Sequence, residues 1–219
     1  MKKVTIGLMI VFMGLLLMVP MARASVYSIS AGNYIYLTIG IGNAVNGGGA
    51  FNVDKVGDGQ GVLFDTFCLE RNEDFYNGQE LYIQSITDSA IAGGYSGAAN
   101  GSDPISSQTA YLYYQWATGA ITHTNTNAVN LQLAIWFFEG EIIAGHLLDY
   151  SSAQTFIDSA NNNAVNGSYY GVQVLNLYDM AGNNSQDQLV YNVVPEPATM
   201  LLFGLGLIGI AGIRRKFKG

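Results

Sequence analysis

The spacing of hydrophobic residues changes twice along this chain of 219 residues, and the change restricts the folds available to it. Hydrophobic and polar residues first alternate as in a β-strand, helical spacing follows, and alternation returns near the end. Strands, a block of helices and then strands again predict an α+β domain with an antiparallel sheet and an inserted helical block. The expected strands cover residues 26–41, 61–70, 79–88, 170–179 and 187–194, and the expected helices cover residues 104–119, 125–141 and 151–165.

Individual residues predict where these elements begin, turn and end. Pro104 and Gly119 bracket the first helix, and Asn127 is a candidate N-cap of the second. The turn-forming stretch 72–78 predicts a hairpin of the strands on either side, with Cys68 near the end of the first arm. The glycine clusters around Phe51 predict tight turns, and they lack the Lys-Ser/Thr of a phosphate-binding loop. In the first strand, we expect Ile35, Leu37, Ile39 and Ile41 to share one face.

The first 24 residues have the three parts of a secretory signal peptide. Lys2 and Lys3 supply positive charge, residues 4–19 are apolar, and Ala22-Arg23-Ala24 supplies the small residues of a cleavage site. We therefore expect residues 1–24 to direct export and the mature chain to start near Ser25. The alternative is an uncleaved membrane anchor, for which the apolar run is short.

The last residues, 193–219, form a second signal. Pro195-Glu196-Pro197 precedes an apolar stretch at residues 198–213, and Arg214 and Arg215 begin a basic end. The order, spacing and terminal position of these parts resemble the PEP-CTERM sorting signal of Gram-negative bacteria. The resemblance implies a transient inner-membrane helix, an exosortase-type processing enzyme as partner, and delivery to the outer cell surface or extracellular matrix. The alternative is a simple tail anchor.

The segment between the two signals, residues 25–192, has the length of one domain with its own core. It carries fifteen acidic residues against only Lys55 and Arg71, so its net charge is −13. Such a surface repels the phosphates of nucleic acids, and we expect no nucleic-acid partner. We also expect no metal and no cofactor, because the acids Asp54, Asp58 and Asp65 lack the spacing of an EF-hand.

One cysteine and one glutamine carry the chemistry that we expect. Cys68 is the only cysteine of the chain, so in an exported protein its thiol cannot form an intramolecular disulfide. Gln132 lies in the aromatic-rich helical stretch 131–138, where a carboxamide needs a partner. A thiolate that attacks this carboxamide releases ammonia and keeps the acyl group on sulfur. The two residues therefore predict an internal thioester.

The neighbours of this pair resemble the signatures of bacterial thioester domains, known from Gram-positive surface adhesins. Phe67-Cys68-Leu69-Glu70 matches the first signature, and Gln132 with Ala134-Ile135-Trp136 matches the last, although Leu131 replaces the usual Thr. Tyr114-Gln115-Trp116 is the nearest match to the middle signature, with Trp116 where a polar residue is expected. The resemblance implies a thioester-like fold over residues 25–192 and a bond that reacts with amines. The supporting residues that we expect are Phe67, Tyr114, Gln115, Trp136 and His146.

The sequence thus predicts a one-shot covalent adhesin whose target is an amine on a surface or matrix, and not an enzyme that turns over. Two alternatives stay open. One is a non-covalent structural component of an extracellular polysaccharide or biofilm matrix, in which Cys68 is simply buried. The other is a cysteine hydrolase that pairs Cys68 with His123, or with His146 and Asp149.

Overall fold

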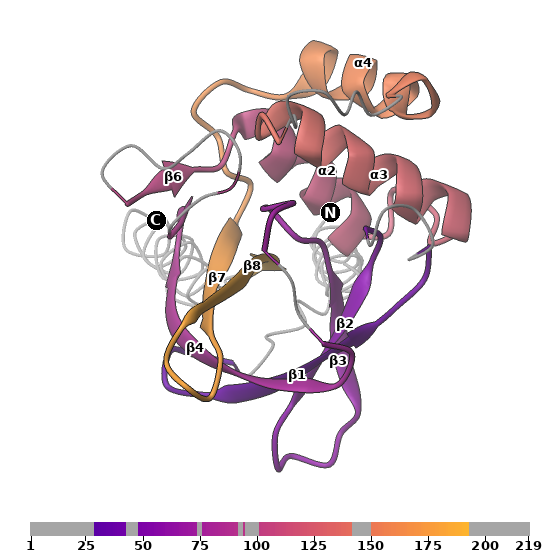
Figure 1. The fold of residues 1–219 in the computed structure, drawn as a ribbon. Helices are drawn as coiled ribbons and strands as arrows, with labels where there is room; N and C mark the ends of the chain where they lie inside the picture. The colour runs from indigo at the N-terminus through magenta and orange to yellow at the C-terminus, as the bar shows by residue number, and fades with distance from the viewer. Residues whose placement is uncertain are drawn as a thin grey trace, which may run out of the picture. The chain divides into compact units, whose positions relative to one another are not determined.

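A six-stranded sheet with helices across one end forms the fold in the computed structural model (Figure 1). The structure describes residues 29–42, 48–73, 76–91, 94, 101–141 and 150–192, which lie in one compact unit, Tyr27–Val194. The strand order is β3-β2-β1-β4-β7-β8, and every neighbouring pair is antiparallel. The strands are β1 (Tyr34–Ile39), β2 (Phe51–Lys55), β3 (Val62–Thr66), β4 (Gln79–Thr87), β7 (Val172–Tyr178) and β8 (Asn184–Tyr191). The predicted α+β class with an antiparallel sheet is confirmed.

The curved sheet closes on itself just beyond β3. Leu69 N donates a hydrogen bond to Asp187 O, and Leu189 N donates to Phe67 O, each at 3.1 Å. These bonds join the segment after β3 to β8, the strand at the other end of the sheet order. Cys68 lies between these two hydrogen bonds. The two edges of the sheet pair with each other here, so they are not open to pairing with another chain.

The predicted hairpin of residues 61–70 and 79–88 is wrong. β3 pairs with β2, whereas β4 pairs with β1 and β7. The region predicted to contain only tight turns holds β2, whose Phe51 and Val53 are buried between polar neighbours. β2 fills one edge of β3, and β8 pairs with the segment that directly follows β3, whereas β4 lies between β1 and β7. Ile39, predicted to share a face with Ile35 and Leu37, lies at the end of β1 and is 47 % exposed, whereas those two residues are buried.

The helical block contains α2 (Ser107–Ala117), α3 (Asn125–Phe138), the 3-10 turn η1 (Ser151–Ala153) and α4 (Gln154–Asn163). The two longer helices begin at hydroxyl caps. The Ser106 hydroxyl accepts from Thr109 N, and the Thr124 hydroxyl accepts from Asn127 N at 3.1 Å. Asn127 is therefore not the N-cap of α3, as the sequence predicted, because Thr124 starts the helix one turn earlier. Its amide instead donates to Thr122 O.

Residues before α2 also differ from the prediction. Pro104 lies in β6 (Asp103–Pro104), a two-residue strand that pairs with β5 (Ser89–Ala90), and so precedes the helix rather than starting it. Gly119 does follow the end of α2, with a φ of 77° that favours glycine.

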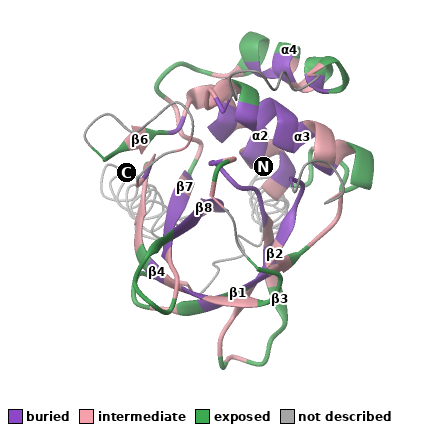
Figure 2. Ribbon diagram, in the orientation of Figure 1, coloured by how far each residue is buried: buried purple, intermediate pink, exposed green. Residues whose placement is uncertain are grey.

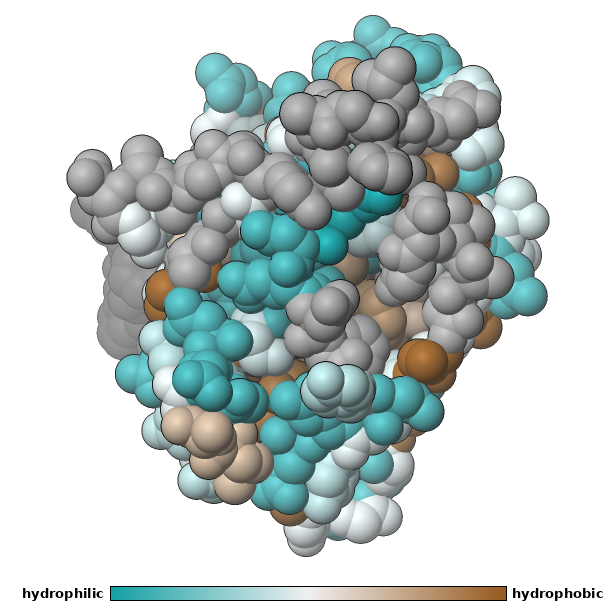
Figure 3. Space-filling model, in the orientation of Figure 1, coloured by the Kyte–Doolittle hydropathy of each residue, from teal (hydrophilic) through white to brown (hydrophobic). Residues whose placement is uncertain are grey.

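The core lies between the inner face of the sheet and helices α2 and α3 (Figure 2). Alternate residues of β1 and β4 supply one side of it, and Trp116 of α2 and Trp136 of α3 are the largest side chains on the other. Figure 3 shows a mostly hydrophilic surface where the described residues are visible, with hydrophobic residues scattered between. On β1 and β4, the inward-facing residues with no exposed surface are Ile35, Leu37, Leu81 and Ile83.

The predicted signal peptide at residues 1–24 and the predicted sorting helix at residues 193–219 lie outside the described residues. Within the described ranges, no helix combines the length and apolarity that crossing a membrane requires.

Candidate functional site

The side-chain amide of Gln132 pairs with the backbone of Cys68 in both directions. Cys68 N donates to Gln132 Oε1 at 3.2 Å, and Gln132 Nε2 donates to Cys68 O at 2.9 Å. The Cys68 thiol donates to the same Oε1 at 3.4 Å. Cys68 has no exposed surface and Gln132 is 1 % exposed. The structure therefore brings the two predicted residues together in a closed site.

Two elements far apart in sequence hold this pair. Gln132 comes from α3, in which six consecutive residues, 131–136, are buried, as expected for a helix packed on all its faces. Cys68 comes from the closure of the sheet, where it forms an antiparallel bridge with Gln188 of β8. The contact between Cys68 and Gln132 thus joins the sheet to the helical block.

Aromatic side chains surround the pair. Phe67 is fully buried and meets the ring of Trp116 edge-on, with centroids 5.1 Å apart. Trp136 lies one helical turn beyond Gln132, and the Arg71 guanidinium lies 5.7 Å from its ring. Among the described residues, the buried Trp136 indole N–H has no oxygen acceptor. Phe67 and Trp136, two of the expected supporting residues, are therefore buried next to members of the pair.

Gly48 packs directly onto the site. A Cβ atom at this position would lie 2.8 Å from Gln132 Cγ and would overlap the ring of Trp136. Gly42 approaches α3 in the same way nearer its start, where an added Cβ would lie 2.7 Å from Ala128 Cβ. These glycines are needed for close approach to α3, a role that the prediction of tight turns did not include.

Buried carboxyl groups lie near the thiol, and Glu70 is central among them. Glu70 Oε2 accepts from Asp187 N at 2.9 Å, whereas its Oε1 has no hydrogen-bond partner among the described residues. Burial, together with the negative charges of Asp187 and Glu73, raises the pKa of Glu70 well above its usual value. Burial also raises the pKa of Asp187, to about 8. Glu141 adds a further buried carboxyl, whose Oε2 accepts from Arg71 N at 2.9 Å.

The same surroundings control the thiol. Burial, and next the negative charge of Glu70, raise the pKa of Cys68 well above its usual value, and the Trp136 indole partly opposes this increase. A free thiol at this site therefore stays protonated at neutral pH. Nucleophilic cysteines of hydrolases have the opposite property, a lowered pKa beside a positive charge.

The two other predicted residues on α2 point elsewhere. Tyr114 stacks on Tyr170 at 5.6 Å and meets Tyr191 edge-on at 5.5 Å, so it packs against the α4–β7 connection and β8. Among the described residues, no hydrogen bond links the Gln115 side chain to Cys68 or Gln132. Trp116, which departs from the expected motif, is the residue of this trio that reaches the core beside Phe67.

The histidines and scattered acids do not extend the site. His123 stacks on Trp116 at 4.0 Å; its Nε2 lies 3.0 Å from Trp116 O and its Nδ1 lies 3.4 Å from Asp65 Oδ2. Both ring nitrogens therefore have partners other than Cys68. His146 and Asp149 lie outside the described residues. In the described ranges, no group of three or more His, Cys, Asp or Glu residues is placed to hold a metal ion.

Sequence reasoning missed the polar half of β8. Residues 180–186 were predicted to be a loop, but β8 begins at Asn184, and Ser185 to Gln188 are all buried. Gln186 Nε2 donates to Glu70 O at 2.9 Å and to Glu73 O at 2.8 Å, which fixes the chain after Cys68. The available signal was the placement of four polar residues directly before the hydrophobic Leu189 and Val190.

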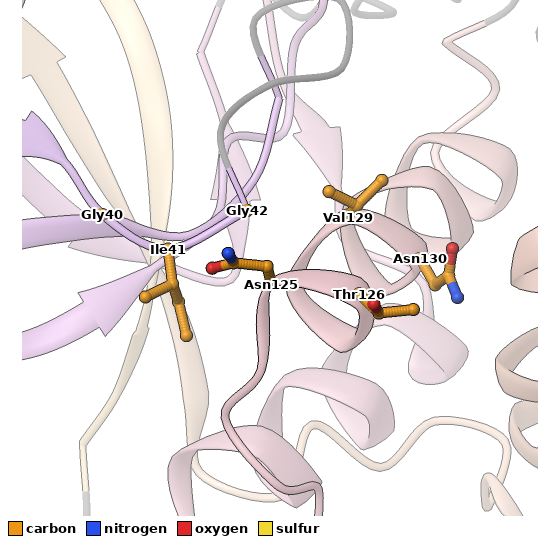
Figure 4. Close-up of a pocket in the computed structure, with 7 residues that line it drawn as sticks. All are labelled: Gly40, Ile41, Gly42, Asn125, Thr126, Val129 and Asn130. Atoms are coloured by element: carbon orange, nitrogen blue, oxygen red, sulfur yellow. The ribbon is translucent and has the colours of Figure 1, made fainter.

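A pocket of about 530 Å³ opens beside the first turns of α3 (Figure 4). It carries no charged side chain, and Val129, one of its residues, precedes Gln132 by about one helical turn. The pocket therefore lies beside the helix that carries the glutamine. Its lining residues are Gly40, Ile41 and Gly42 on one side and Asn125, Thr126, Val129 and Asn130 on the other.

Comparison with known families identifies a PEP-CTERM protein-sorting motif at residues 193–216. The motif implies an exported protein that an exosortase sorts, with a C-terminus anchored transiently in the membrane. It includes the predicted residues Pro195, Glu196, Pro197, Arg214 and Arg215. No curated protein and no solved structure matches the chain.

Proposed function

We propose that Cys68 and Gln132 form an internal thioester, and that the exported protein uses it once to attach covalently to an amine on a surface or matrix target. The proposal rests on one observation above all, the pairing of the Gln132 amide with Cys68 inside a closed site. It describes an acyl transfer without turnover, and so not an enzyme.

The bond forms without any oxidant or cofactor. Cys68 Sγ attacks the side-chain carbonyl carbon of Gln132, the bond from this carbon to Nε2 breaks, and the thiol proton leaves with the nitrogen as ammonia. In the second step a primary amine of the target attacks the same carbon. The carbon–sulfur bond then breaks, an amide joins target and protein, and the Cys68 thiol is regenerated.

The geometry favours the first step. Negative charge develops on Gln132 Oε1 during the attack, and Cys68 N–H already donates to this oxygen at 3.2 Å. Cys68 O accepts from Nε2 at 2.9 Å and so orients the leaving group. The sulfur lies 3.4 Å from Oε1, beside the carbon that it attacks.

Burial is compatible with the product. A thioester is neutral and has no N–H that needs a partner, so it fits a site in which burial and the charge of Glu70 oppose a thiolate. The aromatic rings and Gly48 also keep water away from the bond. The uncharged pocket beside α3 offers a place for neutral groups of the target near Gln132.

A second candidate function is a non-covalent structural role in an extracellular matrix. One observation favours it, since both polar atoms of the Gln132 amide already have backbone partners, as a purely structural buried glutamine requires. Under this alternative, Cys68 is a small buried side chain and the protein never bonds to its target.

Capture of a fluorescent primary amine by the native protein tests the proposal. We expect covalent label at Gln132 in the wild type and none in Cys68→Ala or Gln132→Ala. The matched control is Gln186→Ala, which also removes a buried amide that binds backbone carbonyls, but which leaves the pair in place. Absence of label in the native wild type, when the same amine labels a known thioester protein, would contradict the proposal.

A further inference from the structure

Three tyrosines stand in one row across the outer face of the sheet, away from the Cys68 site. Tyr34 of β1 is directly opposite Tyr82 of β4, and Tyr82 is directly opposite Tyr178 of β7. The rings of Tyr34 and Tyr82 have centroids 5.2 Å apart. Tyr34 is 41 % exposed and the other two are partly exposed. The row is therefore a set of adjacent aromatic rings that a ligand can reach.

The tyrosine row lines a surface hollow of about 350 Å³. Gln84 and Asp179 add polar groups to the lining, and Met180, which is 62 % exposed, adds an apolar one. Asp179 is held in place because its carboxylate accepts from Ala181 N and Asn183 N. The hollow thus combines aromatic faces with fixed hydrogen-bonding groups, as small-molecule sites do.

The topology restricts what can bind here. β1, β4 and β7 are interior strands of the sheet order, each paired on both sides, so an extended peptide has no free edge to join. The net charge of −13 between the terminal signals, and Asp179 in the lining, oppose polyanions such as nucleic acids. Next to the tyrosine row, Asp54 and Glu80 lie on either side of Tyr36. Their polar side chains do not suit contact with a lipid surface.

We infer that the tyrosine row binds a saccharide chain that carries no acidic groups. The C–H faces of pyranose rings pack on aromatic rings, and hydroxyl groups hydrogen-bond to amides, carboxylates and phenols. Neighbouring strands lie about 4.8 Å apart, close to the length of one pyranose unit, so a linear chain across the strands places successive sugars on successive tyrosines. This site does not depend on the thioester.

Affinity measurements with the purified protein test the inference. The probes are hexasaccharides of glucose, of N-acetylglucosamine and of mannose, none of which carries a primary amine that a thioester could capture, with an oligo-alginate as the acidic comparison. We expect binding to at least one of the first three and none to alginate. Tyr34→Ala should weaken binding about tenfold, Tyr82→Phe should keep most of it, and Tyr76→Ala, which alters an exposed tyrosine outside the row, should leave it unchanged.

Two results would overturn the inference: binding to none of the three acid-free probes, or binding that Tyr34→Ala and Tyr76→Ala change equally. Tyr34→Ala also tests the site without disturbing the core, because the side chain lies on the outer face of β1. Cys68→Ala should leave saccharide binding unchanged. Failure of this inference is therefore distinguishable from failure of the thioester proposal.

Discussion

The Gln132 side chain of α3 hydrogen-bonds to both backbone groups of Cys68. Its Oε1 accepts from Cys68 N at 3.2 Å, and its Nε2 donates to Cys68 O at 2.9 Å. The two residues are 64 positions apart, and Cys68 lies where the sheet closes against β8. A single side chain therefore links the helical block to the closure of the sheet. A covalent bond between the same two residues would make that link permanent.

A thioester between Cys68 and Gln132 should stabilise the folded protein as a disulfide does. The bond joins residues 64 positions apart, and closing a loop of this length lowers the entropy of the unfolded chain. This effect stabilises the folded protein by about 4 kcal/mol. We therefore expect cleavage of the bond with hydroxylamine to lower the free energy of unfolding in urea by an amount of this order. Equal stability before and after treatment would speak against a cross-link, and Cys68→Ala, which has no bond to cleave, is the control.

The buried carboxyl groups predict a stability that falls as pH rises. Burial raises the pKa of Asp187 from 3.8 to about 8, so the folded protein holds this proton more tightly than the unfolded chain does. The free energy of unfolding should therefore decrease between about pH 4 and pH 8, by up to about 1.4 kcal/mol per pH unit for each such group. Urea titrations at several pH values measure the slope.

Glu70→Gln tests how much of this pH dependence of stability comes from Glu70. The variant keeps an oxygen that accepts from Asp187 N and removes one buried carboxyl group. We expect a shallower slope and higher stability at pH 8 than in the wild type. Glu80→Gln, on the outer face of β4, is the matched control. An unchanged slope in Glu70→Gln would show that the raised pKa of Glu70 does not govern the pH dependence.

Gly48→Ala should damage the site by crowding. The new methyl group meets Gln132 Cγ and the Trp136 ring, and overpacking of this kind costs about 1–3 kcal/mol. We expect a lower midpoint of thermal unfolding and less amine capture. Gly57→Ala, where an added Cβ meets no atom within 4 Å but φ is 83°, tests for backbone strain alone and should retain capture.

Thr124→Ala tests the N-terminus of α3. Loss of the hydroxyl that accepts from Asn127 N should destabilise the protein by about 1 kcal/mol. Thr126→Ala, an exposed threonine in the first turn of the same helix, should have a smaller effect. The two variants should be compared by urea denaturation, and an equal loss in both would contradict the assignment of Thr124 as the cap.

Local patterns predicted the helices well, because their signals lie within single segments. The spacing of hydrophobic residues placed α2 and α3, and the third helical segment, expected to begin near Ser151 or Ser152, begins with η1 at Ser151. The cap of α3 was placed one turn late because Asn127 and Thr124 are both good capping residues, and sequence alone does not rank them.

The sheet was predicted less well, because strand pairing depends on contacts between distant residues. Nothing near Cys68 in the sequence indicates that residues 67–69 pair with residues 187–189. That pairing makes Ser185 and Gln186, which were expected in a loop, part of a buried polar strand with Asp187 and Gln188. Gln186 and Gln188 became visible as neighbours of the segment around Cys68 only through this pairing.

The proximity of Cys68 and Gln132 was predicted from sequence, through the resemblance of their neighbours to the signatures of bacterial thioester domains together with the thiol without a disulfide partner and the carboxamide on an aromatic helix. The sequence did not indicate that Gly48 lies close to this pair or that carboxyl groups lie near it. Both features depend on how the β1–β2 connection and β8 approach α3. For the same reason Trp116, rather than Gln115, is the residue of α2 that packs near the pair.

Intact-mass spectrometry of the freshly purified native protein tests the central claim most directly. The account predicts a mass lower than the sequence mass by one ammonia, in the wild type and in Gln186→Ala. Cys68→Ala and Gln132→Ala should each have the full mass of their own sequence, and methylamine should convert the wild type to the mass of its methylamide. A full, unmodified sequence mass in the native wild type would contradict the thioester.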